Sequence, residues 1–283
     1  MTLDFDVVVI GAGIAGMTSS LYLKRAGFKV AIIESSAPGG QINKTNSIEN
    51  YPGFLKIDGP SLAFNVFSQI KDVNYKYGNV LKIIDEKDYK IIKTDKEEIK
   101  CKGIIIATGR KNRELGLENE KKLLNKGISY CCICDGFLYK DKEVAIYGNN
   151  NHTIEEALYL SKICKKVYLI TKLEYNNESL IIKNNEITKI NEIDNKISSI
   201  ELDNNEKIEI SGLFIVDGYE PHTEFIDFIS KENNYILVDN KMKTSMDYIY
   251  ACGDVIKKDF YQISIAVGEA STSALNLIKD LNL

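Results

Sequence analysis

The sequence lacks the ligand sets and the charge imbalance that mark several large classes of protein. Its two histidines, His152 and His222, lie far apart, and no second Cys-x-x-Cys pair completes the four ligands of a structural zinc site. The 36 basic and 40 acidic residues leave a formal net charge of -4, so no excess of positive charge attracts nucleic acid or an anionic membrane. These absences argue against a structural zinc protein and against a nucleic-acid-binding protein.

Long apolar runs are also missing. Residues 1–6 contain no basic segment followed by an apolar one, as a secretory signal requires, and no apolar stretch approaches the length that spans a bilayer. We therefore expect a soluble, cytoplasmic protein. Its six cysteines are expected to be thiols in such a reducing compartment, so a disulfide here would serve catalysis rather than structure.

A glycine-rich turn between a strand and a helix opens the chain. The β-branched run 5–10 ends at Gly11-Ala12-Gly13-Ile14-Ala15-Gly16, and residues 17–25 are predicted to form a helix. Gly11 allows the tight turn, Gly13 lets backbone approach a pyrophosphate, and Gly16 lets the helix pack closely. A second strand over 29–33 ends at Glu34, where a carboxylate receives ribose hydroxyls. The pattern predicts a dinucleotide-binding α/β domain.

Further elements of this domain follow. We expect a helix over 59–75, an antiparallel meander over 80–100 and a buried strand over 103–109 that ends in a glycine turn. That turn is a natural point for the chain to leave the first domain. Between these elements, Gly39-Gly40-Gln41 is either an ordinary loop or a segment whose backbone and amide approach the edge of a flat heteroaromatic ring.

The middle of the chain carries the chemistry in Cys131-Cys132-Ile133-Cys134-Asp135. Cys131 and Cys134 have the spacing of a disulfide that closes and reopens, and Asp135 is a candidate proton donor to its sulfurs. Half a zinc site has the same spacing, but the missing second pair favours redox chemistry. Cys132 either diverts this disulfide or is a small buried residue.

In order along the chain, these motifs resemble those of the low-molecular-weight flavin thioredoxin reductases. The matching segments are 11–16, Glu34, 39–41, 49–53, 107–109, 130–136 and 252–254. The resemblance implies an α/β protein of two Rossmann-like domains, each of three ββα layers. A discontinuous FAD-binding domain, 1–112 and 246–283, is then interrupted by a smaller domain, 113–245, that carries the cysteine pair.

The resemblance also implies the roles of individual residues. Gly253 and Asp254 lie beside the ribityl and phosphate part of FAD, and Gln262 with Ile263 reaches the isoalloxazine. Cys134 is the sulfur nearer the flavin, and Cys131 forms the mixed disulfide with thioredoxin. The implied FAD-binding residues are Gly11, Gly13, Ile14, Ala15, Gly16, Glu34, Gly40, Gln41, Asn50, Ala107, Thr108, Gly109, Gly253, Asp254, Gln262 and Ile263.

The second domain departs from the family pattern. After a strand over 143–147, only Gly148 remains of a second dinucleotide fingerprint; Asn150 and Thr153 stand where small residues are usual. The segment 171–177 lacks the arginines that clamp a 2′-phosphate, each worth roughly 1.5 to 3 kcal/mol. The chain therefore resembles the ferredoxin-dependent members, which lack NADPH motifs, and we expect reduced ferredoxin as the electron donor.

Several expectations accompany this interpretation. The domains are expected to rotate about 111–117 and 243–247, and the family implies a homodimer. An acidic ferredoxin needs a basic landing patch. The candidate cations for it are Lys257 and Lys258, Lys165 and Lys166, Lys121 and Lys122, and Arg110 and Lys111.

Three alternatives remain open. The donor is NADPH held in a divergent site, or the protein is a flavin-dependent dithiol oxidase that uses oxygen, or it is a flavoprotein without enzymatic activity. Phe260 and Tyr261 also stand where Tyr and Arg usually precede Gln262, so the environment of the flavin ring is expected to differ locally.

Overall fold

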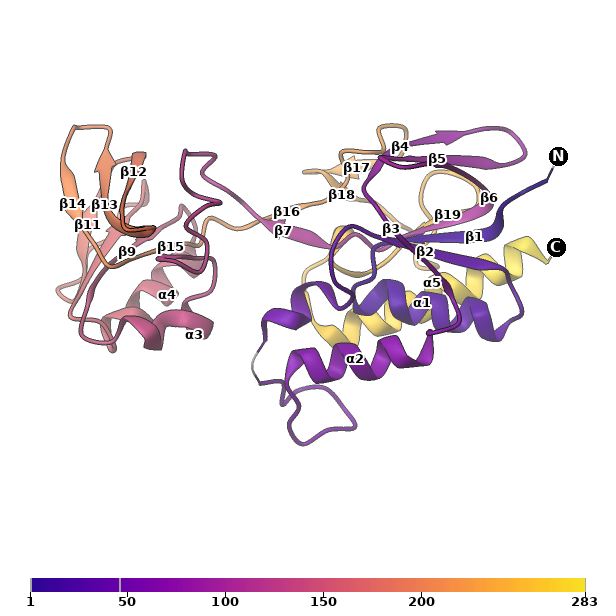
Figure 1. Cartoon of the computed structure of the whole chain (residues 1–283), viewed down its shortest axis with the longest axis horizontal. Coiled ribbons are helices and arrows are strands. Elements are labelled where there is room, and N and C mark those ends of the chain that lie inside the picture. The colour runs from indigo at the N-terminus through magenta and orange to yellow at the C-terminus, as the bar shows by residue number, and fades with distance from the viewer. Residues whose placement is uncertain (1, 46, 283) are drawn as a thin grey trace. The chain divides into compact units, whose positions relative to one another are not determined.

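The computed structural model describes residues 2–45 and 47–282. The chain folds into two compact units. Unit 1 comprises residues 1–111 and 220–283, and unit 2 comprises residues 112–219. Each unit has its own sheet with helices packed against it (Figure 1).

The second boundary of unit 2 lies at 219 and not at the expected 245. The segment 220–245 belongs to unit 1 because Phe225 and Ile226 are buried against the strands of that unit. The backbone N–H of Ile83 also donates to the carbonyl of Phe225 at 3.1 Å. The inserted domain is therefore shorter than the expected 113–245.

A seven-stranded sheet forms the centre of unit 1. Its strands run in the order β3-β2-β1-β6-β5-β4, and β19 also pairs with β6. The pairs β3-β2, β2-β1, β1-β6 and β6-β19 are parallel, whereas β4, β5 and β6 form the antiparallel meander that the sequence predicts. The strands are β1 (Phe5–Ile10), β2 (Val30–Glu34), β3 (Asn74–Tyr77), β4 (Val80–Asp85), β5 (Lys90–Thr94), β6 (Glu98–Ile106) and β19 (Ile249–Ala251).

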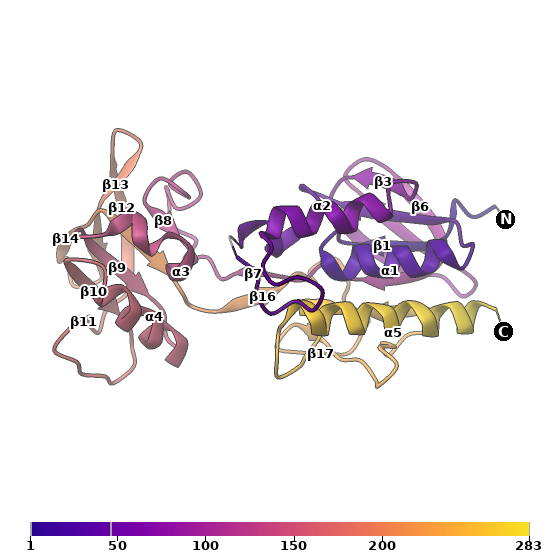
Figure 2. The same cartoon turned by 90° about the horizontal axis from the view of Figure 1, so that it is seen from below.

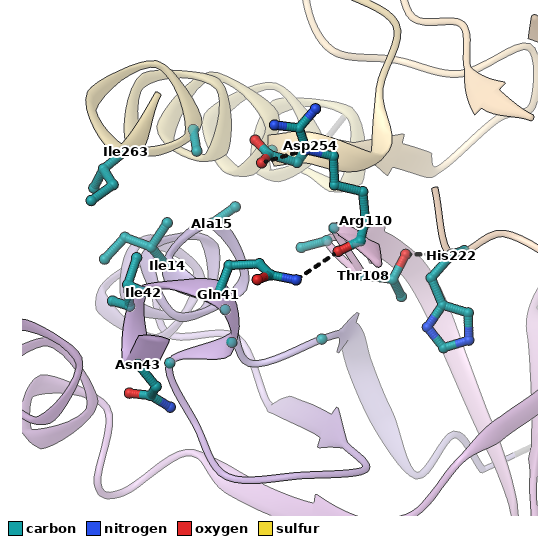
Figure 3. Close-up of a pocket in the computed structure, with 18 of the residues that line it drawn as sticks. Ile14, Ala15, Gln41, Ile42, Asn43, Thr108, Arg110, His222, Asp254 and Ile263 are labelled. Carbon is teal, nitrogen blue, oxygen red and sulfur yellow. Dashed lines mark hydrogen bonds and ion pairs between the residues drawn. The ribbon is translucent and has the colours of Figure 1, made fainter. Parts of the chain in front are cut away.

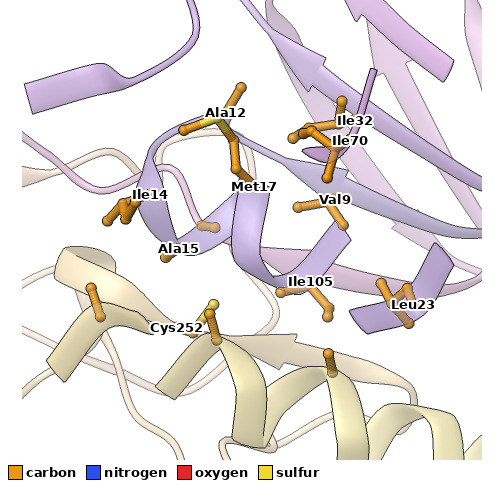
Figure 4. Packing of buried hydrophobic residues seen from close by; sticks show 14 of the residues in the cluster. Val9, Ala12, Ile14, Ala15, Met17, Leu23, Ile32, Ile70, Ile105 and Cys252 are labelled. Atoms are coloured by element: carbon orange, nitrogen blue, oxygen red, sulfur yellow. The ribbon is translucent and has the colours of Figure 1, made fainter. Parts of the chain in front are cut away.

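Both faces of this sheet are buried. Helices α1 (Ile14–Arg25), α2 (Gly59–Gln69) and α5 (Ile263–Leu281) cover one face (Figure 2). Val9 of β1 packs there with Met17 of α1 and Ile105 of β6 (Figure 4). Because side chains alternate along a strand, Val8 and Ile10 point to the other face, where segment 225–236 covers them. That segment includes the paired strands β17 (Lys231–Glu232) and β18 (Tyr235–Ile236). The expected ββα layering is confirmed.

The predicted helix over 59–75 is too long. Asp58 caps α2 by accepting the N–H of Ser61 at 2.8 Å, but the helix ends at Gln69. Ile70 and Val73 turn into the core, and Tyr75 lies in β3, which extends the sheet beside β2. The apolar pattern continues after Gln69, but these residues pack as a turn and strand β3 and not as a fourth helical turn. Periodicity alone therefore does not predict where the helix ends.

Unit 2 is built on a five-stranded parallel sheet in the order β11-β10-β9-β15-β8. Its strands are β8 (Ile128–Ser129), β9 (Glu143–Tyr147), β10 (Lys166–Ile170), β11 (Ile181–Lys183) and β15 (Gly212–Ile215). A separate antiparallel sheet contains β12 (Ile187–Ile193), β13 (Lys196–Leu202) and β14 (Lys207–Glu209). The helical segments are α3 (Cys132–Asp135), η2 (Gly136–Tyr139) and α4 (Asn151–Ser161). Short strands β7 (Arg110–Asn112) and β16 (Tyr219–Pro221) pair where the chain passes between the units.

Within residues 2–45 and 47–282, none of the helices is both long enough and apolar enough to cross a membrane.

Candidate functional site

A cavity of about 600 Å³ lies in unit 1, beyond the carboxyl ends of β1, β2 and β6 (Figure 3). This position and volume are typical of cofactor sites in α/β folds. Of the residues expected to bind FAD, only Gly16 and Asn50 do not line it. Those that do are Gly11, Gly13, Ile14, Ala15, Glu34, Gly40, Gln41, Ala107, Thr108, Gly109, Gly253, Asp254, Gln262 and Ile263.

The three glycines of the first turn have separate structural roles. Gly11 has φ +99°, and a Cβ there would lie 2.4 Å from the carbonyl oxygen of Ala107. A Cβ on Gly16 would lie 1.8 Å from the carbonyl oxygen of Gly11, so this glycine is required for packing although it does not line the cavity. A Cβ on Gly13 would meet nothing within 4 Å and would project into the open cavity. Packing within the protein does not require a glycine at position 13. The missing side chain leaves space for a ligand in the cavity.

Glu34 ends β2 at the rim of the cavity. Its Oε2 accepts the N–H of Ala12 at 2.8 Å, and its Oε1 accepts the N–H groups of Ser35 and Ser36 at 2.8 and 2.9 Å. These bonds fix the carboxylate where the sequence places a ribose partner. Ser35 and Ser36 also line the cavity, and their roles were not apparent from the sequence.

Two separate hydrogen bonds from side-chain amides link segments around the cavity in pairs. Asn50 Nδ2 donates to Gln262 Oε1 at 3.1 Å, so Asn50 supports a lining residue without lining the cavity itself. Gln41 Nε2 donates to the carbonyl oxygen of Arg110 at 3.0 Å (Figure 3). Gln262 is the N-cap of α5 and makes no side-chain cap, so the N-terminus of that helix is available to a ligand in the cavity.

Sequence reasoning missed the place of Arg110 in the cavity. The sequence assigns Arg110 to a surface patch, but it lines the cavity, with Nε 3.4 Å from Asp254 Oδ2 and its guanidinium 3.9 Å from the ring centroid of Tyr261. Lys258 lies 5.2 Å from the same ring and 2.7 Å from Glu269. Burial raises the pKa of Glu269 although Lys258 opposes this. The local difference expected from Tyr261 is therefore the guanidinium of Arg110, from β7, stacked on the Tyr261 ring.

The redox motif begins where α3 leaves the end of β8. Cys131 is disulfide-bonded, as the sequence predicts for it; the side chain of Cys134 lies outside the described part of the chain. Asp135 Oδ2 accepts the hydroxyl of Ser129 at 2.6 Å, and Ser129 Oγ accepts the N–H of Cys131 at 3.0 Å. The expected acid is thus connected to Cys131 through Ser129. Cys101, Cys132, Cys164 and Cys252 are buried free thiols.

Cys132 is fully buried in the core of unit 2. Burial raises the pKa of its thiol, and the nearby carboxylate of Glu156 raises it further. A thiol that resists ionisation is a poor nucleophile. The structure therefore supports the small buried residue and not a competitor for the disulfide.

The second glycine turn, in unit 2, is closed by its own side chains. Asn150 caps α4, because its Oδ1 accepts the N–H of Thr153 at 3.1 Å while its Nδ2 donates to the carbonyl of Val216 at 3.0 Å. The buried Thr153 hydroxyl donates to the same carbonyl at 2.7 Å. By contrast, Gly13, the N-cap of α1 in unit 1, makes no side-chain cap. One helix N-terminus is thus open toward a cavity and the other is satisfied within the protein.

An acid adds to this closure. Asp217 Oδ1 accepts the backbone N–H of Asn149 at 2.8 Å, in the turn where a pyrophosphate would lie. Asn149 Oδ1 in turn accepts the N–H of Lys172 at 2.7 Å, which fastens the next strand end to the turn. The matching amide of unit 1, the N–H of Ala12, is likewise bonded to a carboxylate, that of Glu34. Sequence reasoning missed Asp217, although an acid directly after the apolar strand β15 was a visible signal.

The expected basic patch is electrically compensated. Every candidate cation has a carboxylate partner in its own unit. The pairs are Lys257 with Glu232, Lys258 with Glu269, Lys165 and Lys166 with Glu143, Lys121 with Glu114, Lys122 with Glu192, Arg110 with Asp254, and Lys111 with Glu224. These lysines and arginines therefore do not supply the uncompensated positive surface that an acidic partner would need.

The expected hinge at 243–247 is corrected as well. Lys243 forms a bridge with Tyr250 inside unit 1, and the chain crosses between units at 111/112 and 219/220. Beyond the first crossing, the buried Glu120 accepts the N–H groups of Leu115 and Gly116 at 3.1 and 2.8 Å. The expected hinge 111–117 is therefore tied to unit 2 at its C-terminal end.

The residues of unit 1 fit a flavin dinucleotide. The open space at Gly13, the two helix N-termini without side-chain caps and the anchored carboxylate of Glu34 are the features that a pyrophosphate, an electron-poor ring and a ribose require. In the second turn, the N–H groups of Asn149 and Thr153 are bonded to side chains of the protein, those of Asp217 and Asn150.

Comparison with known proteins agrees with this arrangement. Residues 5–270 match the family described as pyridine nucleotide-disulphide oxidoreductase. The chain is 33% identical to a thioredoxin reductase of Bacillus subtilis, over 95% of this chain and 92% of that protein. It also resembles the crystal structure of Lactococcus lactis thioredoxin reductase, with 34% identity, 99% coverage of both chains and a TM-score of 0.79. A ferredoxin-flavin thioredoxin reductase from Clostridium acetobutylicum aligns with 29% identity, 98% coverage of both chains and a TM-score of 0.58.

Proposed function

The chain belongs to the pyridine nucleotide-disulphide oxidoreductase family and, within it, to the low-molecular-weight thioredoxin reductases, and from this premise we propose the path that its electrons take. The residues that line the cavity of unit 1 would hold FAD. The proposed electron donor is reduced ferredoxin and not NADPH. The Cys131/Cys134 disulfide is the acceptor within the chain, and the reduced pair passes the electrons to a thioredoxin. Homodimerisation and a cytoplasmic location are part of the same proposal.

The observation that carries the proposed donor is the contrast between the two glycine turns. In unit 1 the turn and the first amides of α1 face an open cavity, with no side-chain cap from Gly13. In unit 2, Asn150 stands at the position of Gly13, and its side chain is bonded to the N–H of Thr153 and to the carbonyl of Val216. A nucleotide that entered there would have to displace this side chain and break both hydrogen bonds, which makes its binding less favourable.

Bound FAD supplies the two-electron reduction of the disulfide. The residues of the chain then act on the sulfurs and protons. The Cys131 thiolate attacks one sulfur of the thioredoxin disulfide; that S–S bond breaks, a mixed disulfide forms, and the leaving thiolate takes a proton from Asp135. The Cys134 thiol then gives its proton to Asp135 and attacks Cys131; the mixed disulfide breaks, the internal disulfide reforms, and the second thioredoxin thiolate takes that proton from Asp135 and leaves as part of a dithiol. Ser129 holds the Asp135 carboxyl in place for these proton transfers.

One cysteine pair has to serve both a buried flavin and a protein partner. We propose that the units change their relative orientation during turnover, about the crossings at 111/112 and 219/220. This proposal replaces the hinge at 243–247 that the sequence suggested.

An anaerobic titration of the FAD-loaded protein tests the donor. Reduced ferredoxin is expected to bleach the flavin absorbance and then to reduce thioredoxin, with one thioredoxin disulfide lost per two electrons. NADPH at micromolar concentration is expected to do neither. Rapid bleaching by NADPH would contradict the proposed donor, and a protein that cannot be loaded with flavin would contradict the whole electron path.

A second pair of measurements separates the alternatives. The Cys131→Ser variant is expected to keep its flavin and its reduction by ferredoxin but to lose thioredoxin reduction. A flavin-dependent dithiol oxidase would instead release peroxide in air with a small dithiol and would leave thioredoxin unreduced. A flavoprotein without enzymatic activity would show neither reaction.

A further inference from the structure

Two ionisable side chains lie beside the redox motif without a role in the steps above. Helix α3, which begins at Cys132, packs against α4 within unit 2 (Figure 1). From α4, Glu156 Oε2 accepts the backbone N–H of Cys132 at 3.2 Å. His152 Nε2, one helical turn earlier, lies 3.0 Å from Glu156 Oε1. A continuous set of polar contacts therefore runs from His152 to the peptide group that joins Cys131 to Cys132.

Covalent geometry brings the carboxylate close to the reactive sulfur. The N–H that Glu156 accepts is two bonds from the Cα of Cys131. The Glu156 side chain is 12% exposed, so water screens its charge weakly. The His152 side chain is 58% exposed and exchanges protons freely with solvent. The pair therefore has a weakly screened inner member at the Cys131–Cys132 peptide and a solvent-exposed outer member.

We propose that Glu156 and His152 form a pH-responsive pair that positions charge beside Cys131 and so sets the reactivity of its thiol. The inference rests on the proposed function, because it takes Cys131 as the sulfur that exchanges with the partner. Ionised Glu156 opposes the formation of a thiolate on Cys131. A protonated His152 offsets that charge, so the opposition is weaker when His152 is charged and complete when it is neutral.

The other charged and thiol groups around this pair are few in the described part of the chain. Glu155 lies 3.5 Å from His152 Nδ1 on the same helix. From α3, Asp135 acts on the Cys132 thiol, as does Cys164 from the segment after α4. The raised pKa of Cys132, to which Glu156 contributes after burial, shows that this carboxylate already acts on one neighbouring sulfur.

The alkylation rate of Cys131 measures this effect directly. In a Cys134→Ser background, Cys131 stays a thiol after reduction, and tandem mass spectrometry distinguishes its reaction with iodoacetamide from that of Cys132. Glu156→Gln is expected to speed alkylation at about pH 7 by about threefold to tenfold, because the thiolate fraction rises. Glu155→Gln is the matched control: it removes the same charge one residue away without touching the Cys132 N–H, and its rate is expected to change less than twofold.

The pH dependence tests the role of His152. His152→Asn is expected to slow alkylation about threefold at about pH 6 and to leave it unchanged at about pH 8.5, because only a charged imidazole offsets the charge of Glu156. Equal rates for Glu156→Gln and its parent would overturn the proposal, as would an equal effect of Glu155→Gln or a pH-independent effect of His152→Asn. The measurement uses no flavin, donor or thioredoxin, so its failure is distinct from a failure of the proposed function.

Discussion

At the scale of single residues, the link between Asp135 and Cys131 depends on one hydroxyl. Ser129, which is buried at the end of β8, donates to Asp135 and accepts from the backbone of Cys131. A serine hydroxyl carries one proton and two lone pairs, so both bonds exist at the same time. The carboxyl group is thereby held on the same side of α3 as the start of the cysteine motif.

Asp135→Asn is expected to lower kcat for thioredoxin reduction about 100-fold, because an amide cannot exchange the proton that a thiolate needs. Steady-state reduction of thioredoxin by the ferredoxin-coupled protein measures it, with flavin content as the check on folding. Ser129→Ala keeps the acid and loses only its anchor, so a decrease below tenfold is expected. If Asp135→Asn keeps half or more of the activity, Asp135 is not the proton donor.

The predictable residues are those whose chemistry is visible in a short motif. Cys131, Asp135 and the glycines of the first turn follow from spacing, since each motif is read within a few positions. Arg110 and Asp217 do not, because each acts on a partner brought close only by the fold: Tyr261 in one case and the amide of Asn149 in the other.

At the scale of the elements, two glycines of the turn between β1 and α1 have different functions. Gly16 is required for packing, and Gly13 leaves space for a ligand. Gly16→Ala places a methyl group 1.8 Å from a backbone oxygen, whereas Gly13→Ala places one in open space within the cavity. Gly16→Ala is therefore expected to lower the free energy of unfolding by about 2–3 kcal/mol. Gly13→Ala is expected to leave stability within about 0.5 kcal/mol and to weaken FAD binding at least tenfold.

Urea unfolding of the flavin-free protein and fluorescence titration with FAD measure the two quantities, and each variant serves as the control for the other. Should Gly13→Ala bind FAD with unchanged affinity, the pyrophosphate does not lie at this turn.

The loop after β7 supplies a second element that can be tested. Glu120 is 2% exposed and also accepts the hydroxyl of Tyr130 at 2.7 Å, so it joins the segment 115–116 to the residue before Cys131. The side chain in Glu120→Gln is uncharged and has one acceptor oxygen, so at least one of these three bonds is lost and the others weaken. The substitution is expected to destabilise unit 2 by about 1–3 kcal/mol. Hydrogen exchange at Leu115 and Gly116 is expected to quicken at least tenfold.

The exposed neighbour Glu118 provides the matched substitution. Glu118→Gln is expected to leave both the exchange rates and the unfolding midpoint unchanged. Similar exchange in the two variants would mean that Glu120 does not hold this segment.

Strong periodic patterns predict that most of the helices and strands exist, but they do not predict the residues at which these elements end. The buried strands and the long helix α5 are continuous apolar or amphipathic runs, which few other structures accommodate. Helix α2 ends six residues before its predicted limit because the apolar residues that follow it pack as a turn and an edge strand. Such an ending depends on what the chain meets in space, which a local pattern does not contain.

At the scale of the whole molecule, contacts between distant parts of the chain also explain why the second domain boundary lies at 219 and not at the predicted 245. The segment 220–245 contains few strong elements, so the sequence offered no reason to separate it from unit 2. Its burial against the sheet of unit 1 is a long-range contact, with Phe225 and Ile229 packed on strands that lie more than a hundred residues earlier in the chain. Only the folded arrangement reveals it.

The architecture predicts that unit 1 folds and binds its cofactor without unit 2. Strands β7 and β16 pair at the crossing, so their ends are close enough to be joined by a short Gly/Ser turn in place of residues 112–219. The shortened protein is expected to be yellow, with FAD affinity within about tenfold of the full chain, and to have no thioredoxin reductase activity. Absorbance spectra and FAD titration check this.

The full chain with Cys131→Ser is the control for that experiment, since it lacks the same activity but keeps both units. A folded but colourless unit 1 would show that residues 112–219 contribute to the flavin site.

The closed turn of unit 2 also restricts how the protein can change over successive mutations. Asn150, Thr153 and the carbonyl of Val216 satisfy one another, and a Cβ on Gly148 would collide with two of these partners. Replacing any one of them leaves the others in place, so a single substitution lowers folding stability without reopening the turn. Reopening it would take several coordinated substitutions, and the closed form is therefore hard to reverse by stepwise mutation.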